Sequence, residues 1–101
     1  MNSGNRMRGD EAMKITLDIS LYPLDADYIP VIKRFIRELR KQAQIEIVTN
    51  QMSTQVRGEF DIVWAAVTAG MRQSMAGDIK CMFVTKCLNA DLDIGRLPVI
   101  E

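Results

Sequence analysis

The residues from Lys14 to Tyr22 alternate strictly between apolar and polar or amphipathic side chains. The apolar members are Ile15, Leu17, Ile19 and Leu21. A period of two predicts a β-strand that turns one face toward a core. Pro23 ends this strand because proline has no N–H group to donate to a neighbouring strand. The segment therefore belongs in a sheet that is covered on one side.

An amphipathic helix follows the first strand. Apolar residues recur at spacings of three and four from Tyr28 to Leu39, and charged residues fill the opposite side. Pro30 is tolerated because it falls in the first turn, and we expect Asp25 or Asp27 to cap the helix. Basic residues near its C-terminus complement the helix dipole, so we interpret this face as solvated rather than phosphate-binding.

Two short strands and a second helix come next. Residues 45–49 and 53–58 have strand character and are joined by a tight polar connection at Asn50-Gln51. A second apolar stripe predicts a helix over about 59–75. A last strand is expected over 79–88 because bulky residues suited to β-structure return there.

The order strand, helix, strand, strand, helix, strand is the split βαβ plan. We therefore predict an α+β domain of the ferredoxin-like βαββαβ type, with a four-stranded antiparallel sheet and both helices on one face. This domain should span residues 14–88. Residues 1–13 are polar and are expected to form a flexible N-terminal arm. Residues 89–101 form a C-terminal tail without periodicity, for which a short edge strand and a partner contact are both open.

Composition limits the classes of function. Thirteen basic and thirteen acidic residues give a formal net charge of zero, so no overall field attracts nucleic acid or an anionic membrane. Histidine, the commonest general base near neutral pH and the commonest zinc ligand, is absent from the sequence. We therefore expect no catalytic residue, metal or cofactor. No apolar run approaches the ~20 residues that span a bilayer, so we expect a cytoplasmic protein without membrane insertion.

The two cysteines lie in the same predicted strand. Cys81 and Cys87 are six positions apart, which is about 20 Å in an extended chain and too far for a disulfide. We expect free thiols in a reducing compartment. Because they share a strand face with Phe83, we interpret both as small buried hydrophobic side chains.

Short polar side chains occur at strand ends that the ferredoxin-like plan brings to one edge of the sheet. In that plan the end of the first strand lies beside the start of the third, and we expect Ser20 and Tyr22 to lie alongside Ser53 and Thr54. Such groups suit a neutral heterocycle, whose ring Tyr22 or Met52 would cover. The alternative is that they only satisfy backbone groups at turns. The candidate ligand-binding residues are Ser20, Tyr22, Thr49, Asn50, Met52, Ser53 and Thr54.

These segments resemble the YkoF-type family of small thiamine- and hydroxymethylpyrimidine-binding proteins. The resemblance covers roughly Lys14 to Leu88 and rests on residues 20–24, 27–29, 31–33, Thr49-Asn50, Ser53-Thr54, Arg57-Gly58, Asp61, Val63 and Ala65-Ala66. It implies a ferredoxin-like domain that binds thiamine or its hydroxymethylpyrimidine moiety without catalysing a reaction. It also implies that a single domain of this kind forms a homodimer or homotetramer.

Two other functions stay open. An oligomeric structural or regulatory domain would use the polar outer face of the sheet, including Asp18 and Arg57, for assembly. An enzyme acting on a small aromatic compound is the least favoured, because only carboxylates are available as acid or base and nothing resembles an activated nucleophile.

Overall fold

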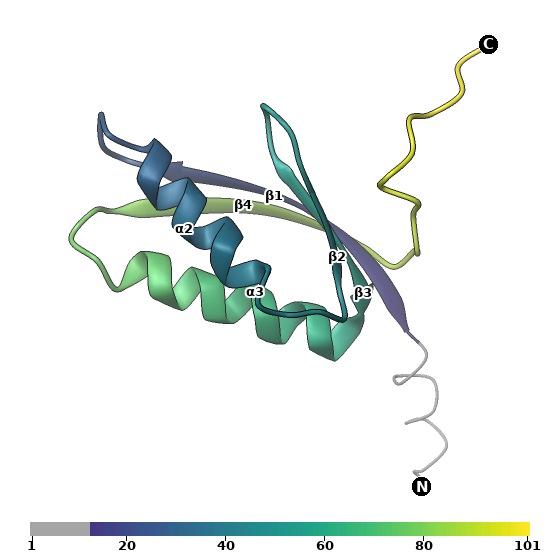
Figure 1. Ribbon diagram of the computed structural model, residues 1–101, viewed down its shortest axis with the longest axis horizontal. Helices are drawn as coiled ribbons and strands as arrows, with labels where there is room; N and C mark the ends of the chain where they lie inside the picture. Colours follow the sequence, from purple (N-terminus) through teal and green to yellow (C-terminus); the bar gives the residue numbers. More distant parts are fainter. Residues whose placement is uncertain (1–12) are drawn as a thin grey trace, which may run out of the picture.

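The structure is a computed structural model that describes residues 13–101, and its elements follow the predicted order (Figure 1). The expected N-terminal arm therefore lies, apart from Met13, outside the described residues. The elements are β1 (Lys14–Pro23), α2 (Ile29–Leu39), β2 (Glu46–Thr49), β3 (Thr54–Glu59), α3 (Phe60–Met75) and β4 (Cys81–Leu88).

The four strands form one antiparallel sheet in the order β2-β3-β1-β4. Both helices pack on the same face of this sheet (Figure 1). The ferredoxin-like prediction is confirmed. The predicted bounds differ from the observed ones by only one or two residues for the strands after β1 and for α3. Glu59, expected as the first residue of that helix, is instead its N-cap and accepts a hydrogen bond from the backbone N–H of Ile62 (3.2 Å).

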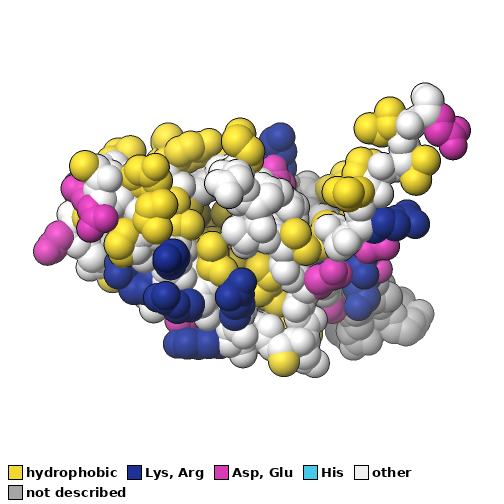
Figure 2. Space-filling view, turned by 45° about the horizontal axis from the view of Figure 1, so that its top comes forward, with side chains coloured by type: hydrophobic (Ala, Val, Ile, Leu, Met, Phe, Trp, Pro, Cys, Tyr) yellow, Lys and Arg dark blue, Asp and Glu magenta, His cyan; other side chains and the backbone are white. Residues whose placement is uncertain are grey.

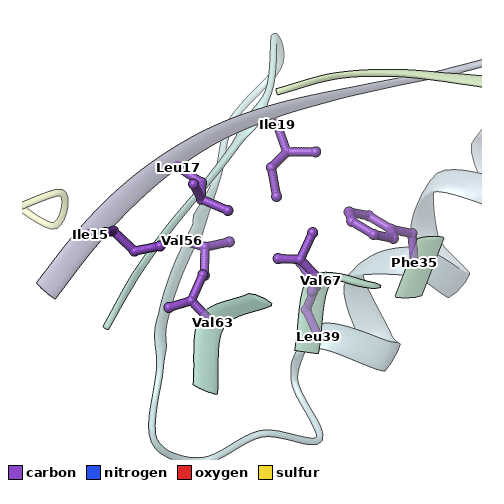
Figure 3. Packing of buried hydrophobic residues seen from close by; sticks show 8 residues of the cluster. All are labelled: Ile15, Leu17, Ile19, Phe35, Leu39, Val56, Val63 and Val67. Atoms are coloured by element: carbon purple, nitrogen blue, oxygen red, sulfur yellow. The ribbon is translucent and has the colours of Figure 1, made fainter. Parts of the chain in front are cut away.

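The core lies between the sheet and the two helices, where the apolar positions of β1 point (Figure 3). Its fully buried members are Ile15, Leu17, Ile19, Phe35, Leu39, Val56, Val63 and Val67. The ring of Phe35 meets that of Phe83 edge to face, with centroids 5.2 Å apart. The alternation that predicted β1 therefore also identified the residues around which both helices pack.

The helix α2 begins without a side-chain cap. Tyr28 occupies the N-cap position, and no side chain hydrogen-bonds there. Asp25 instead accepts a hydrogen bond from the backbone N–H of Asp27 (3.0 Å) within the preceding loop. The expectation that one of these two aspartates caps the helix is wrong, because the helix begins beyond their reach.

The even-numbered positions of β1 point to the face of the sheet away from the helices, called the outer face below. The C-terminal tail covers the beginning of that face. The Thr16 hydroxyl donates to the carbonyl of Ala90 (2.7 Å) and accepts from the backbone N–H of Leu92 (3.1 Å). Arg57 contacts the Leu92 carbonyl and forms ion pairs with Glu46 (2.7 Å) and Asp91 (3.7 Å). These contacts hold residues 90–92 against the body of the protein.

Beyond these contacts the tail extends away from the domain, and its apolar side chains stand clear of the body (Figures 1 and 2). Leu97, Val99 and Ile100 are each at least 80% exposed. Residues 89–101 contain no strand, so the possibility of an edge strand does not apply within this chain. Contact of the tail with a partner stays a prediction.

Both cysteines are free thiols, but they differ in burial. Cys81 is half-buried, whereas Cys87 is exposed. The interpretation of both as buried side chains is therefore wrong for Cys87. Their strand, β4, is at the edge of the sheet, where only one neighbouring strand gives cover.

Candidate functional site

A small cavity of about 80 Å³ lies where β1, α2 and the turn between β2 and β3 meet. One wall is apolar and the other is polar. The apolar wall consists of Ile19 and Leu21 from β1 with Ile32 and Phe35 from α2. The polar wall consists of residues 49–54, which comprise the end of β2, the turn of residues 50–53 (the β2–β3 turn below) and the first residue of β3.

Two threonine hydroxyls form the inner part of the polar wall. Thr49 and Thr54 are partners across β2 and β3, and their Oγ1 atoms lie 3.0 Å apart. Thr54 is also the cross-strand partner of Ile19 and is only 6% exposed, so it faces the helices. A hydroxyl offers one donor and two acceptors. One hydrogen bond between the two leaves a donor and several acceptor sites available to a neutral polar ligand.

The β2–β3 turn is organised by the side chain of Asn50. Its Oδ1 atom accepts hydrogen bonds from the backbone N–H groups of Met52 (2.9 Å) and Ser53 (3.0 Å). The backbone N–H of Asn50 donates to the carbonyl of Ser53 (3.0 Å). Asparagine commonly stabilises turns in this way. The side-chain carbonyl of Asn50 therefore already satisfies backbone groups of the turn, which is the alternative role considered for it in the sequence. Met52, at the tip of the turn, is 86% exposed.

Ser20 and Tyr22 lie on the other side of the sheet. The register places Ile19, not Ser20, opposite Thr54, and successive residues of a strand point to opposite faces. Ser20 is instead paired with Val84 and Tyr22 with Met82 on the outer face. The expectation that Ser20 and Tyr22 lie alongside Thr54 is wrong for this reason, whereas Ser20 does share the outer face with the Ser53 hydroxyl, which bonds Asp18. Five candidates, Thr49, Asn50, Met52, Ser53 and Thr54, do line the cavity, and their contact with a ligand stays a prediction.

Asp18 contributes to this end of the sheet, whereas the sequence favoured a role for it at an exposed or oligomer-facing surface. Its Oδ1 atom accepts hydrogen bonds from the Ser53 hydroxyl (2.7 Å) and from Nε2 of Gln55 (2.9 Å). The hydrogen bonds from Gln55 and then Ser53 hold the pKa of the Asp18 carboxyl below its ordinary value. The pairing of Asp18 with Gln55 across β1 and β3 is the signal that would have identified this role of Asp18.

The apolar wall was also missed as part of a site. Ile19, Leu21, Ile32 and Phe35 were all predicted on the core side of their elements, but a core position does not reveal a cavity beside it. Among the described residues that line the cavity, none has a carboxylate, amine or thiol side chain. The arrangement provides shape, apolar contact and hydrogen bonds.

Within residues 13–101 no group of three metal-ligating side chains is placed to hold a metal ion. In the same part of the chain, neither helix has the length and apolar character required to cross a membrane.

The fold and the cavity define a ferredoxin-like domain with a small half-apolar, half-hydroxylic cavity at one end of its sheet. Residues 14–90 match the YKOF-related family, and the chain belongs to that family. The resemblance seen in the sequence is thus confirmed. No curated protein is similar enough to the chain to count as a relative.

Several solved structures share the fold. A hypothetical protein from Methanocaldococcus jannascii is 20% identical with a TM-score of 0.68, and the match covers 80% of this chain and 84% of that one. A domain of unknown function, DUF77, from Bacillus cereus is 16% identical with a TM-score of 0.67, and the match covers 78% of each chain. A protein from Thermotoga maritima, described as a thiamine biosynthesis or salvage protein, is 20% identical with a TM-score of 0.64 over 85% of this chain and 90% of that one. At these identities the similarity establishes the fold alone.

Proposed function

We propose that this protein binds thiamine or its hydroxymethylpyrimidine moiety and does not transform it. The observation that carries the proposal is the paired hydroxyls of Thr49 and Thr54 opposite the apolar wall of the cavity. An aminopyrimidine ring has apolar faces and a polar edge, which such a cavity complements. Membership of the YKOF-related family and the description of the Thermotoga maritima protein support this choice of ligand.

In this proposal the ring lies between Phe35 and Ile19, and its amino group and ring nitrogens meet the hydroxyls of Thr49 and Thr54. Ligand pockets usually have volumes of roughly 300–1,000 Å³, whereas this cavity has about 80 Å³. The β2–β3 turn, whose exposed Met52 lines the cavity, therefore moves outward when the ligand enters. Met52 then covers the ring with an adaptable apolar side chain.

Thermal unfolding with thiamine, hydroxymethylpyrimidine and an unrelated purine tests the proposal. A ligand at 100 times its dissociation constant stabilises the folded state by about 2.7 kcal/mol, so thiamine or hydroxymethylpyrimidine should raise the melting temperature and the purine should not. Mass spectrometry of the recovered ligand should show it unchanged. A folded protein that gives no shift with either ligand at millimolar concentration would contradict the proposal, and so would a chemically altered ligand.

A second function, self-assembly through the outer face, is favoured by a separate observation. Tyr22, Met82 and Val84 are each about half exposed, and the register places them together on β1 and β4. Clustered exposed apolar side chains on a sheet face are typical of interaction surfaces. A homodimer or homotetramer would cover them.

The mass of the particle in solution tests this assembly. Val84→Lys should lower the mass to that of the monomer, whereas Lys33→Met on the exposed side of α2 should leave it unchanged. A wild-type protein that is monomeric at high concentration would contradict the assembly.

The proposed location is the cytoplasm, which the free thiols of Cys81 and Cys87 support.

A further inference from the structure

The polar wall of the cavity is tied to the rest of the protein from the opposite face of the sheet. Ser53 belongs to the β2–β3 turn and lines the cavity, yet its hydroxyl donates to Asp18 on the outer face (2.7 Å). Nε2 of Gln55 donates both to the same Asp18 oxygen (2.9 Å) and to the Ser53 hydroxyl (2.8 Å). The three side chains therefore form a closed triangle of hydrogen bonds.

This triangle continues to the organising residue of the turn. The side-chain amide of Asn50 lies 3.5 Å from Oε1 of Gln55, and Asn50 Oδ1 holds the backbone N–H groups of Met52 and Ser53. All four residues of the turn line the cavity. The contacts thus run from Asp18, through Gln55 and Ser53, to the tip of the turn that lines the cavity.

The anchor of these contacts is rigid, while the turn itself is exposed. Asp18 lies in β1, which is paired with β3 on one side and β4 on the other. Leu17 and Ile19, its neighbours in the chain, are both buried in the core. Hydrogen bonds to a carboxylate are roughly twice as strong as those between neutral groups. A single charged acceptor on a fixed strand can therefore determine where a four-residue turn lies.

We propose that Asp18 is a positioning residue for the cavity, setting the conformation of the β2–β3 turn, and hence the width and polar edge of the cavity, from the outer face of the sheet. The identity of the ligand rests on the proposed function, but the effect of Asp18 on the turn does not. A different role for Asp18 would be simple charge pairing with Lys86, its cross-strand partner. The carboxylate hydrogen-bonds the turn region instead, and its salt bridge with Lys86 is absent among the described ion pairs.

Backbone order parameters from 15N relaxation, measured without ligand, test the effect on the turn. In Asp18→Ala the order parameters of Met52 and Ser53 should fall from the rigid range near 0.85 to below about 0.6, while those of Val56 stay unchanged. Asp18→Asn keeps one acceptor oxygen and should give an intermediate value. Asp25→Ala is the matched control, because among residues 13–101 its carboxylate bonds only the nearby loop. Unchanged order at Met52 and Ser53 in a folded Asp18→Ala protein would overturn the inference.

Thiamine titration of the same variants tests the consequence for binding. Asp18→Ala should raise the dissociation constant about tenfold, chiefly through faster release, since the ligand must then order the turn itself. Asp25→Ala should bind like the wild type. Ser53→Ala should weaken binding as well. In the double variant with Asp18→Ala the dissociation constant should rise little further, because both changes remove the same hydrogen bond between Ser53 and Asp18.

The two proposals fail in different ways. Absence of binding by the wild-type protein contradicts the proposed function and leaves the order parameters to decide the role of Asp18. Wild-type binding with an unchanged affinity in Asp18→Ala overturns the positioning role and leaves the proposed function intact.

Discussion

Thr49 and Thr54 face each other across β2 and β3 with their Oγ1 atoms 3.0 Å apart, on the side of the sheet that the helices cover. Paired threonine hydroxyls satisfy each other in the free protein and can exchange one partner for a ligand without leaving a buried polar group unpaired. This makes Thr54, the more buried of the two, the most informative position at which to test recognition.

Replacing Thr54 by valine keeps the shape of the side chain and removes its hydroxyl. We expect thiamine or hydroxymethylpyrimidine affinity to fall about tenfold, with a stability cost of about 1 kcal/mol, because one hydrogen bond is lost in each case. Isothermal titration and denaturant unfolding measure the two effects. Thr85→Val is the matched control, since Thr85 is the other cross-strand partner of Ile19 but does not line the cavity. Equal affinity in Thr54→Val and the wild type would show that the Thr54 hydroxyl does not bind the ligand.

The hydrogen-bonded carboxylate of Asp18 predicts a pH dependence of stability. Its pKa is lowered in the folded state by the hydrogen bonds from Gln55 and Ser53. A carboxyl group whose pKa is lower in the folded than in the unfolded state stabilises the fold at pH values above its pKa in the unfolded chain, which is about 3.9 for aspartate. This stabilisation is lost as the pH falls through the pKa of the folded state. Urea unfolding of wild type and Asp18→Asn between pH 7 and pH 3 should therefore show a stability difference that shrinks toward acid. A difference independent of pH would contradict the assignment.

Close contact between the helices predicts a large effect of a small substitution at Gly70. A Cβ atom at this position would lie 2.8 Å from Cε1 of Phe35, so alanine forces α2 and α3 apart or moves the Phe35 ring. We expect Gly70→Ala to lower the free energy of unfolding by about 1–3 kcal/mol, despite the better helix propensity of alanine. Gly77→Ala is the control, because the nearest atom to a Cβ there lies 3.9 Å away. A Gly70→Ala protein as stable as the wild type would show that the contact relaxes freely.

The tail contacts predict a local effect at Leu92. The backbone N–H of Leu92 is held by the Thr16 hydroxyl, and the side chain of Arg57 contacts its carbonyl. Replacing Thr16 by valine should speed hydrogen exchange at the Leu92 amide about tenfold, because the hydrogen bond that protects it is lost. Thr68→Val on α3 provides the control, since the hydroxyl of Thr68 donates to carbonyl groups of its own helix. Unaltered exchange in Thr16→Val would mean that the tail is held by other groups.

Much of the fold could be predicted because its signals are local. The alternation in β1 and the two apolar stripes depend on the repeat of strand and helix, and each therefore shows in a short segment of sequence. Turn chemistry at Asn50 is local too, and the structure places its side chain within the expected turn. The cap of α2 was mispredicted because a capping aspartate depends on where the helix begins, which the sequence places only approximately.

The candidate site was predicted only in part, for a reason that Ser20 illustrates. Its position at the end of β1 was correct, but a ligand site also depends on the face of the sheet, and a shift of one residue in register reverses that face. The register pairs Ile19 with Thr54 and so turns Ser20 and Tyr22 away from the cavity. The part played by Asp18 depends on the same register, which brings residues 35 and 37 positions later in the chain into hydrogen bonds with it.

The sequence by itself determined the order of the elements, the ferredoxin-like plan and the core side of β1, because side-chain periodicity and turn residues act over a few neighbouring positions. Only the tertiary structure decided which polar residues meet. It joined Thr49 to Thr54 beside an apolar wall, linked Asp18 to Ser53 on the outer face, and turned Ser20 and Tyr22 away from the two threonines. These relations depend on strand register and on helix placement, which arise from the packing of the whole chain rather than from any single segment.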